Sequence, residues 1–259
     1  MPREIVQSIP ANPLVADVAG TLATAVASSL RQSSSASLLL SGGLDSALIG
    51  HLVPPAIRLD LVTVGLETRN EFASAQSVAD FLHRPLRRVV VTAEEARAMA
   101  VRLSEFYGVA GAARSIQTAL ALALAAARET VVLCGQGADE LFFGYHHFHS
   151  LSTEVRTAQQ QEDWVKLIQR DLPVTRAIAE SGGKILECPY LDARLRDAVE
   201  RVPDRQLFSG EASKPFLRQV ARYLGLPPEL AGRSKRAIQY GSGIDQLLRV
   251  ESGARIRGV

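Results

Sequence analysis

Short apolar segments and longer amphipathic segments alternate along the first 150 residues of the chain. Apolar residues recur at helical spacing over residues 72–82 and 116–127, which predicts helices there. Four other apolar segments have the length of strands: residues 36–40, 59–64, 88–91 and 130–134. Strands that are apolar on both faces and alternate with helices predict an α/β fold with a Rossmann-like parallel sheet. Such sheets place their binding sites at the carboxyl ends of the strands.

The second half of the chain has a different pattern. After about residue 150 the strand signal fades, and helical segments are broken by prolines and glycines such as Pro173, Gly182 and Pro203. We therefore predict one continuous unit over residues 1–259, with a sheet core over about 36–150 and a helical part over about 151–250. A domain boundary near Ser150 remains an alternative.

Residues 14–30 form an apolar stretch that resembles an export signal in composition. Asp17 interrupts it, and Leu14, Val18, Leu22 and Val26 have helical spacing. Signal sequences have uninterrupted apolar cores, so this pattern favours an amphipathic helix. Other apolar runs fall far short of the roughly 20 residues that a membrane-spanning helix needs, and no membrane partner is expected.

The composition excludes some classes of protein. The chain is 47% apolar and 22% charged, as in ordinary globular proteins. Its formal net charge is only +2 and basic residues are dispersed, so no nucleic-acid partner is expected. Cys134 and Cys188 lie in apolar contexts without the spacing of a zinc site or a disulfide framework. These features favour a cytoplasmic protein.

A glycine-containing loop joins the first predicted strand to a helix. Two adjacent glycines let backbone N–H groups converge on an anion. The positive end of the helix dipole and two serine hydroxyls would also bind the anion. An aspartate beside phosphate requires a cation, so Asp45 predicts bound Mg²⁺. The loop lacks the GxxxxGK[ST] and GxGxxG patterns, which disfavours kinase-like transfer of the γ-phosphoryl group.

The predicted ATP pyrophosphate-binding residues are Ser41, Gly42, Gly43, Leu44, Asp45 and Ser46. The alternative is a tight turn in which Ser41 caps the helix.

A second glycine-containing segment follows the fourth predicted strand, from Gly135 to Tyr145. Because parallel strands end at the same sheet edge, Asp139 is expected near Asp45, and the two acids would share Mg²⁺. The alternative is that Asp139 and Glu140 only stabilise the first turn of a helix. That alternative does not explain the two glycines ahead of them.

Several segments resemble a known family. The first loop matches the SGGxDS motif of N-type ATP pyrophosphatases, and residues 135–145 resemble the SGEGADELFGGY stretch in the synthetase domain of asparagine synthetases. Residues 189–192, 214–218 and 233–243 are similar, in the same order, to that family's P-F-L-D, K-x-x-L-R and R-x-K…G segments. The resemblance implies an adenine nucleotide alpha hydrolase-like fold. It also implies adenylation of a carboxylate by ATP, with aspartate and ammonia giving asparagine as the first expectation.

The resemblance also implies roles for single residues. Only four of the 29 basic residues are lysine, and Lys214 and Lys235 fall on motif positions. We expect Lys235 to be catalytic, because a compact ammonium suits charge developing on a transferring group. Lys214 and Gly135 are expected to bind ATP, with a solvated surface lysine as the alternative for Lys214. Val64 and Gly65 are expected to contact adenine through backbone atoms.

The sequence departs from the family at three places. Gln136, expected at a catalytic position, replaces a glutamate suited to accepting a proton. Glutamine is no base, so the proton goes to water or to another acid such as Glu140, or the acceptor is not ammonia. Phe143 replaces a glycine and is expected to narrow the pocket. The chain starts at Met1 without the N-terminal cysteine of a glutaminase, so we expect no glutaminase domain and ammonia from solution or a separate glutaminase subunit.

Two other functions stay open at this point. One is a regulatory protein that binds ATP or AMP without turnover, which Gln136 favours. The other is a tRNA-modifying pyrophosphatase, for which the sequence lacks a basic face. Within the ligase class, amidation or ring closure of a carboxylate on another metabolite or peptide is the alternative to asparagine synthesis. The sequence leaves a homo-oligomer open.

Overall fold

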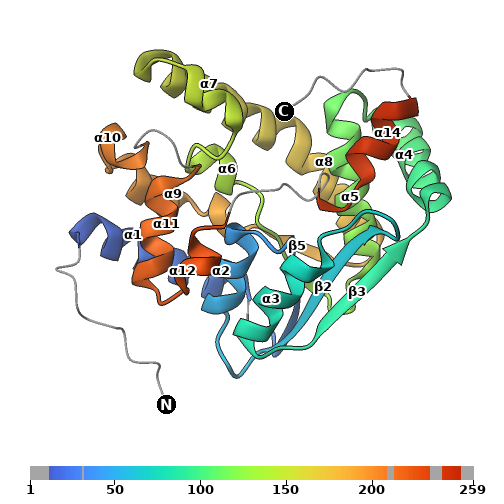
Figure 1. The fold of residues 1–259 in the computed structure, drawn as a ribbon, viewed down its shortest axis with the longest axis horizontal. Helices are drawn as coiled ribbons and strands as arrows, with labels where there is room; N and C mark the ends of the chain where they lie inside the picture. The colour runs from blue at the N-terminus through green and yellow to red at the C-terminus, as the bar shows by residue number, and fades with distance from the viewer. Residues whose placement is uncertain (1–11, 31, 209–212, 234–240, 252–259) are drawn as a thin grey trace.

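Five parallel strands form one sheet at the centre of the molecule (Figure 1). The computed structural model describes residues 12–30, 32–208, 213–233 and 241–251. The strands are β1 (Ser35–Leu39), β2 (Arg58–Leu66), β3 (Leu86–Val91), β4 (Val131–Leu133) and β5 (Ile185–Glu187), in the order β3-β2-β1-β4-β5. The predicted parallel α/β fold is confirmed, and the structure contains all four predicted strands.

A fifth strand, which the sequence did not indicate, lies in the second half of the chain, predicted to be largely helical. β5 pairs with β4 through Val131 opposite Ile185, and so extends the sheet from within the region expected to be helical. It is only three residues long, between Gly183 and Pro189, which leaves too few positions for a strand pattern to be read.

Helices cover both faces of the sheet. Leu38 and Leu61 pack in a core cluster with residues of α1, α2, α3, α9 and α11, whereas Leu39 and Val62 pack with residues of α5 and α8. Consecutive strand residues thus face opposite layers, as a parallel sheet buried on both sides requires. The helices are α1 (Pro13–Ser29), α2 (Leu44–Leu52), α3 (Phe72–Leu82), α4 (Ala93–Tyr107), α5 (Ala112–Ala126), α6 (Ala138–Leu141), α7 (Thr153–Lys166), α8 (Leu172–Ser181), α9 (Ala193–Glu200), α10 (Asp204–Leu207), α11 (Pro215–Tyr223), α12 (Pro228–Ala231) and α14 (Ile244–Glu251). Three shorter helical segments are η1 (His146–Ser150), the π-helical η2 (Leu167–Asp171) and η3 (Pro189–Leu191).

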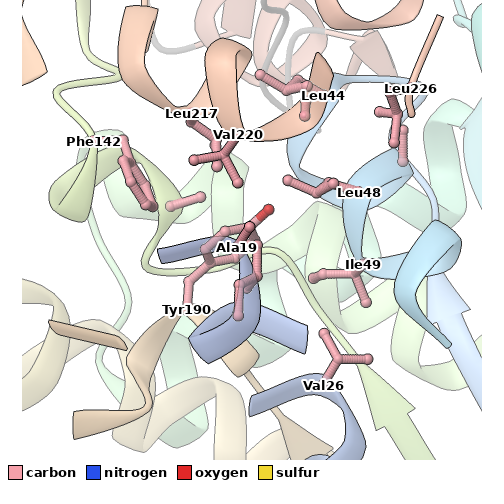
Figure 2. Close-up of a cluster of buried hydrophobic side chains, with 14 of the residues drawn as sticks. Ala19, Val26, Leu44, Leu48, Ile49, Phe142, Tyr190, Leu217, Val220 and Leu226 are labelled. Atoms are coloured by element: carbon pink, nitrogen blue, oxygen red, sulfur yellow. The ribbon is translucent and has the colours of Figure 1, made fainter. Parts of the chain in front are cut away.

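The helix α1 packs against helices from both halves of the chain. Its residues Val18, Leu22 and Val26 are fully buried, which confirms the predicted amphipathic helix. α1 packs against α2, α9 and α11, and Figure 2 shows Ala19 and Val26 of α1 in one cluster with Leu48 of α2 and Val220 of α11. Among the described residues, no helix combines the length and apolar character needed to cross a bilayer.

Phe143 does not narrow the pocket, which corrects the expectation from the sequence. Its side chain is 1% exposed and packs edge-on against Phe148 and Phe208, at ring distances of 5.2 and 6.0 Å. Its φ of 54° lies in the left-handed region, where glycine carries no steric cost. The phenyl ring therefore fills the hydrophobic core beside the site and does not line the cavity described below.

Candidate active site

The loop between β1 and α2, which is predicted to bind phosphate and is called the phosphate loop below, has a backbone geometry that requires glycine. Gly42 has a φ of 77°, and a side chain on it would lie 2.7 Å from the Ala75 backbone nitrogen, so glycine is required. The Ser41 N–H donates to Ser46 Oγ at 3.2 Å, which closes the loop. Gly43 is the N-cap of α2, and no side chain caps this helix. Ser41 Oγ accepts from the N–H of Gly43 itself at 3.3 Å, so Ser41 bonds to the N-cap residue and does not cap an N–H of the first helical turn.

The second glycine-containing segment meets this loop at the carboxyl edge of the sheet. β1 and β4 are neighbours, while the chain continues from β1 toward β2 and from β4 toward β5. The connections thus diverge on opposite sides of a switch point, where α/β sheets form their binding crevices. Gly135 lies against Asp45, since an added side-chain carbon would be 3.3 Å from Asp45 Cβ.

A buried lysine joins the two loops. Lys214 Nζ lies 2.5 Å from Asp45 Oδ2 and 2.7 Å from Asp139 Oδ1, and the lysine side chain is 3% exposed. Burial acts to lower the pKa of Lys214, but the negative charges of Asp139 and Asp45 outweigh it, so the pKa lies above its ordinary value. The expectation that the two acids lie together is confirmed. The alternative of a solvated surface lysine is wrong for Lys214.

Glu140 and Tyr145 form a second buried pair beside these charges. Tyr145 Oη donates to Glu140 Oε1 at 2.5 Å, and Glu140 is 5% exposed. Burial, and then the charge of Asp139, raise the pKa of Glu140 to about 7, against the opposing effects of the Tyr145 hydrogen bond and the Lys214 charge. Burial and the neighbouring Glu140 raise the pKa of Tyr145, so the phenol stays protonated. Glu140 is thus an acid that exchanges its proton near neutral pH.

The shifted pKa of Glu140 makes stability depend on pH. Between its unfolded pKa near 4.5 and its folded pKa near 7, the folded chain holds the proton more tightly, so stability falls as pH rises. Relative to Glu140→Gln, the wild-type protein should lose about 2–3 kcal/mol of unfolding free energy between pH 5 and pH 8. Urea unfolding at both pH values measures this difference. If the unfolding free energies of the two proteins changed equally with pH, the raised pKa of Glu140 would be contradicted. Tyr145→Phe removes a hydrogen bond that lowers this pKa, so it should move the pH-dependent loss of stability to higher pH.

These groups border a cavity of about 150 Å³. Two arginines that the sequence analysis did not mark as site residues also line it. Arg218 donates to the carbonyls of Ser213, Ala231 and Arg233 at 2.6, 2.6 and 2.9 Å. Arg233 donates to the carbonyls of Gly42 and Ser74 at 3.1 and 2.9 Å, and so holds the phosphate loop against α3. Arg218 and Arg233 both lie in segments that resemble the family. No sequence pattern, however, indicates which backbone carbonyls their side chains contact.

Most of the predicted site residues meet at this cavity. Those that line it are Ser41, Gly43, Leu44, Asp45, Ser46, Gly135, Gln136, Asp139, Glu140 and Lys214. Gly42 borders a second cavity, of about 400 Å³, on the other side of the loop. Val64 and Gly65 border neither of these two cavities, and their expected backbone contact with adenine stays a prediction. Lys235 lies outside the described residues.

The fold and the two loops together define a parallel α/β protein whose candidate site lies at the carboxyl ends of the strands. The profile of the asparagine synthase family matches residues 17–187 and 185–252, and the chain belongs to this family. It is 25% identical over 251 residues to a provisionally named glutamine-hydrolysing asparagine synthetase of Methanocaldococcus jannaschii, covering 82% of this chain and 46% of that protein. It is 26% identical over 219 residues to the glutamine-hydrolysing asparagine synthetase of Mus musculus, covering 78% and 39%. The chain thus spans less than half the length of these relatives.

Two solved structures align along most of the chain at low identity. One is NMN synthetase from Francisella tularensis, with a TM-score of 0.45, 11% identity and coverage of 97% of this chain and 90% of that chain. The other is NH3-dependent NAD synthetase from Campylobacter jejuni, with a TM-score of 0.46, 15% identity and coverage of 93% and 85%.

Proposed function

We propose that the protein is an ATP-dependent ligase that adenylates a carboxylate and converts it into an amide. The observation that carries this proposal is the contact of Lys214 with both Asp45 and Asp139 in the wall of one cavity. It joins the phosphate loop to the second acidic segment at the point where a nucleotide phosphate and a second substrate can meet. Membership of the asparagine synthase family supports the same chemistry.

The reaction would run in two displacements. A carboxylate oxygen attacks the α-phosphorus of ATP, the bond from this phosphorus to the β-phosphate oxygen breaks, and pyrophosphate leaves. An uncharged amine then attacks the acyl carbon, AMP leaves, and the nitrogen gives up one proton. Ser41, Gly43 and Ser46 would bind the pyrophosphate with the N-terminus of α2. Glu140 would accept the proton, because its pKa of about 7 suits a base at neutral pH.

The residues present also fit Mg²⁺, the expected cofactor alongside ATP. Asp45 and Asp139 both reach one nitrogen atom, so they are close enough to share a cation. Asp45 Oδ1 is buried and has no hydrogen-bond partner among the described residues. Mg²⁺ commonly binds through one or two carboxylates together with phosphate oxygens, and when bound it neutralises phosphate charge.

One assay tests the proposal. The protein is incubated with Mg-ATP, ammonia and a panel of carboxylic acids, and pyrophosphate and AMP are measured. Release of both that depends on an acid is the expected result. Formation of ADP would contradict cleavage at the α-phosphorus. Aspartate is the first acid in the panel, and acids from other metabolites and peptides follow. The nitrogen would come from free ammonia, another amine or a separate glutaminase subunit.

A regulatory protein that binds ATP or AMP without turnover is the second candidate. Gln136 favours it, because this residue lines the cavity where the family carries a glutamate, and its amide cannot act as a base. Tight ATP binding without pyrophosphate release from any acid would establish this alternative.

A further inference from the structure

One wall of the cavity is built from carbon and sulfur atoms. Ile116 and Leu120 of α5, Leu167 of η2 and Cys134 at the end of β4 line this part. All four pack in the core cluster on the α5 and α8 face of the sheet, the face opposite to α2 and α11. We call these four residues the apolar wall. The wall is therefore separate from the loop and the lysine that would hold phosphate.

The basic residues that line the cavity are already engaged. Within the described part of the chain these are Lys214, Arg218 and Arg233. Lys214 binds two carboxylates, and the two arginines donate to five backbone carbonyls. These bonds direct the two guanidinium groups toward backbone carbonyls, and none of the four residues of the apolar wall carries a charge.

The other charged groups near the apolar wall are acidic. Asp171 borders the cavity, and both of its carboxylate oxygens accept from its neighbour Arg170, at 2.8 and 3.3 Å. Glu140 borders the cavity as well. Free aspartate would bring a second carboxylate into this region after its first one had reacted. At the apolar wall that charge would lie beside acids and apolar side chains, with no basic residue among the four that form the wall, which is unfavourable.

Resting on the proposed function, we propose that the acceptor is a monocarboxylic acid with an uncharged, apolar body. Its carboxylate lies at the α-phosphate beside Asp45 and Asp139, and its body lies on the apolar wall. Carboxylate oxygen attacks phosphorus and pyrophosphate leaves, as for any acceptor. The site then distinguishes acids by contact with Ile116, Leu120 and Leu167, and a second carboxylate is rejected.

Pyrophosphate release with hydroxylamine as the amine tests this proposal. Hydroxylamine converts each acyl adenylate into a hydroxamate, so the assay does not depend on the natural nitrogen donor. The panel contains straight-chain acids of two to eight carbons, 3-phenylpropanoate and aspartate. We expect kcat/KM for the best apolar acid to exceed that for aspartate by about tenfold or more, since a single methylene contact contributes on this scale. A preference for aspartate overturns the proposed acceptor and leaves the ligase function intact. Absence of pyrophosphate with every acid overturns the ligase function itself.

Substitutions at two neighbouring positions test whether the apolar wall determines which acid is preferred. Leu167→Arg places a cation on the apolar wall and should lower kcat/KM for the apolar acid about tenfold while raising that for aspartate. Ile168→Arg is the matched control, because Ile168 follows in the same π-helical segment, is 36% exposed and does not line the cavity. If Leu167→Arg does not fold, Ile116→Gln at a half-buried position replaces it. If a substitution changes KM for ATP but leaves the order of preference among the acids unchanged, the apolar wall binds the nucleoside. That result would overturn the proposal.

Discussion

Replacing Lys214 with alanine is expected to destabilise the protein by about 3–5 kcal/mol, because two partly buried carboxylates lose the ammonium that contacts both. The Lys214 side chain is 3% exposed, and the two carboxylates that it binds are each 20% exposed. Without the ammonium, Asp45 and Asp139 would face each other in a poorly hydrated site. Urea unfolding at pH 7 measures the loss.

The control for this experiment is Lys166→Ala, since Lys166 is exposed at the end of α7. Its unfolding free energy should stay within about 0.5 kcal/mol of the wild-type value. Added Mg²⁺ should stabilise Lys214→Ala more than the wild-type protein, because the metal can take the place of the ammonium. Equal stability of Lys214→Ala and Lys166→Ala would show that the charge cluster is not held by Lys214.

The second large effect is expected at Lys235. We expect Lys235→Ala to lower kcat for pyrophosphate release about a hundredfold or more, with the dissociation constant for ATP nearly unchanged. The reason is that a point cation stabilises charge that appears only in the transition state, so its loss affects turnover more than binding. Rapid-quench assays and equilibrium ATP binding measure the two quantities separately.

Lys235→Arg is the informative companion to this variant. It keeps the charge but replaces a compact ammonium with a planar group, so only part of the activity should return. Lys166→Ala again provides the baseline. Full activity of Lys235→Ala would show that Lys235 is not catalytic. If the affinity for ATP fell by the same factor as kcat, Lys235 would contact ATP already in the ground state.

The sheet and most of the site could be predicted because their signals are local in the sequence. Each predicted strand is a continuous apolar segment, and the glycines that shape the phosphate loop lie beside the residues they position. Asp45 and Asp139 could be placed together from topology alone, since both follow strands that end at the same edge. These inferences needed no knowledge of how the second half folds.

What could not be predicted depends on contacts between distant parts of the chain. The burial of Lys214 requires α11 to pack against the phosphate loop, and sequence alone does not distinguish a buried lysine from a solvated one. The direction in which Phe143 points follows from its left-handed backbone and from aromatic neighbours on η1 and α10. No sequence pattern indicates that the loop after β2 folds back over Gly65, with Asn70 against the glycine.

The order of the chain has a consequence for how this site comes into being during synthesis. A nascent chain that has reached residue 200 already carries the whole phosphate loop and both carboxylates. It still lacks Lys214, and Tyr190, whose hydroxyl donates to the Asp45 carbonyl at 3.1 Å, has only just been added. The two acids therefore stay without this cation until synthesis has passed residue 214. Assembly of the charge cluster thus depends on the helical half of the chain.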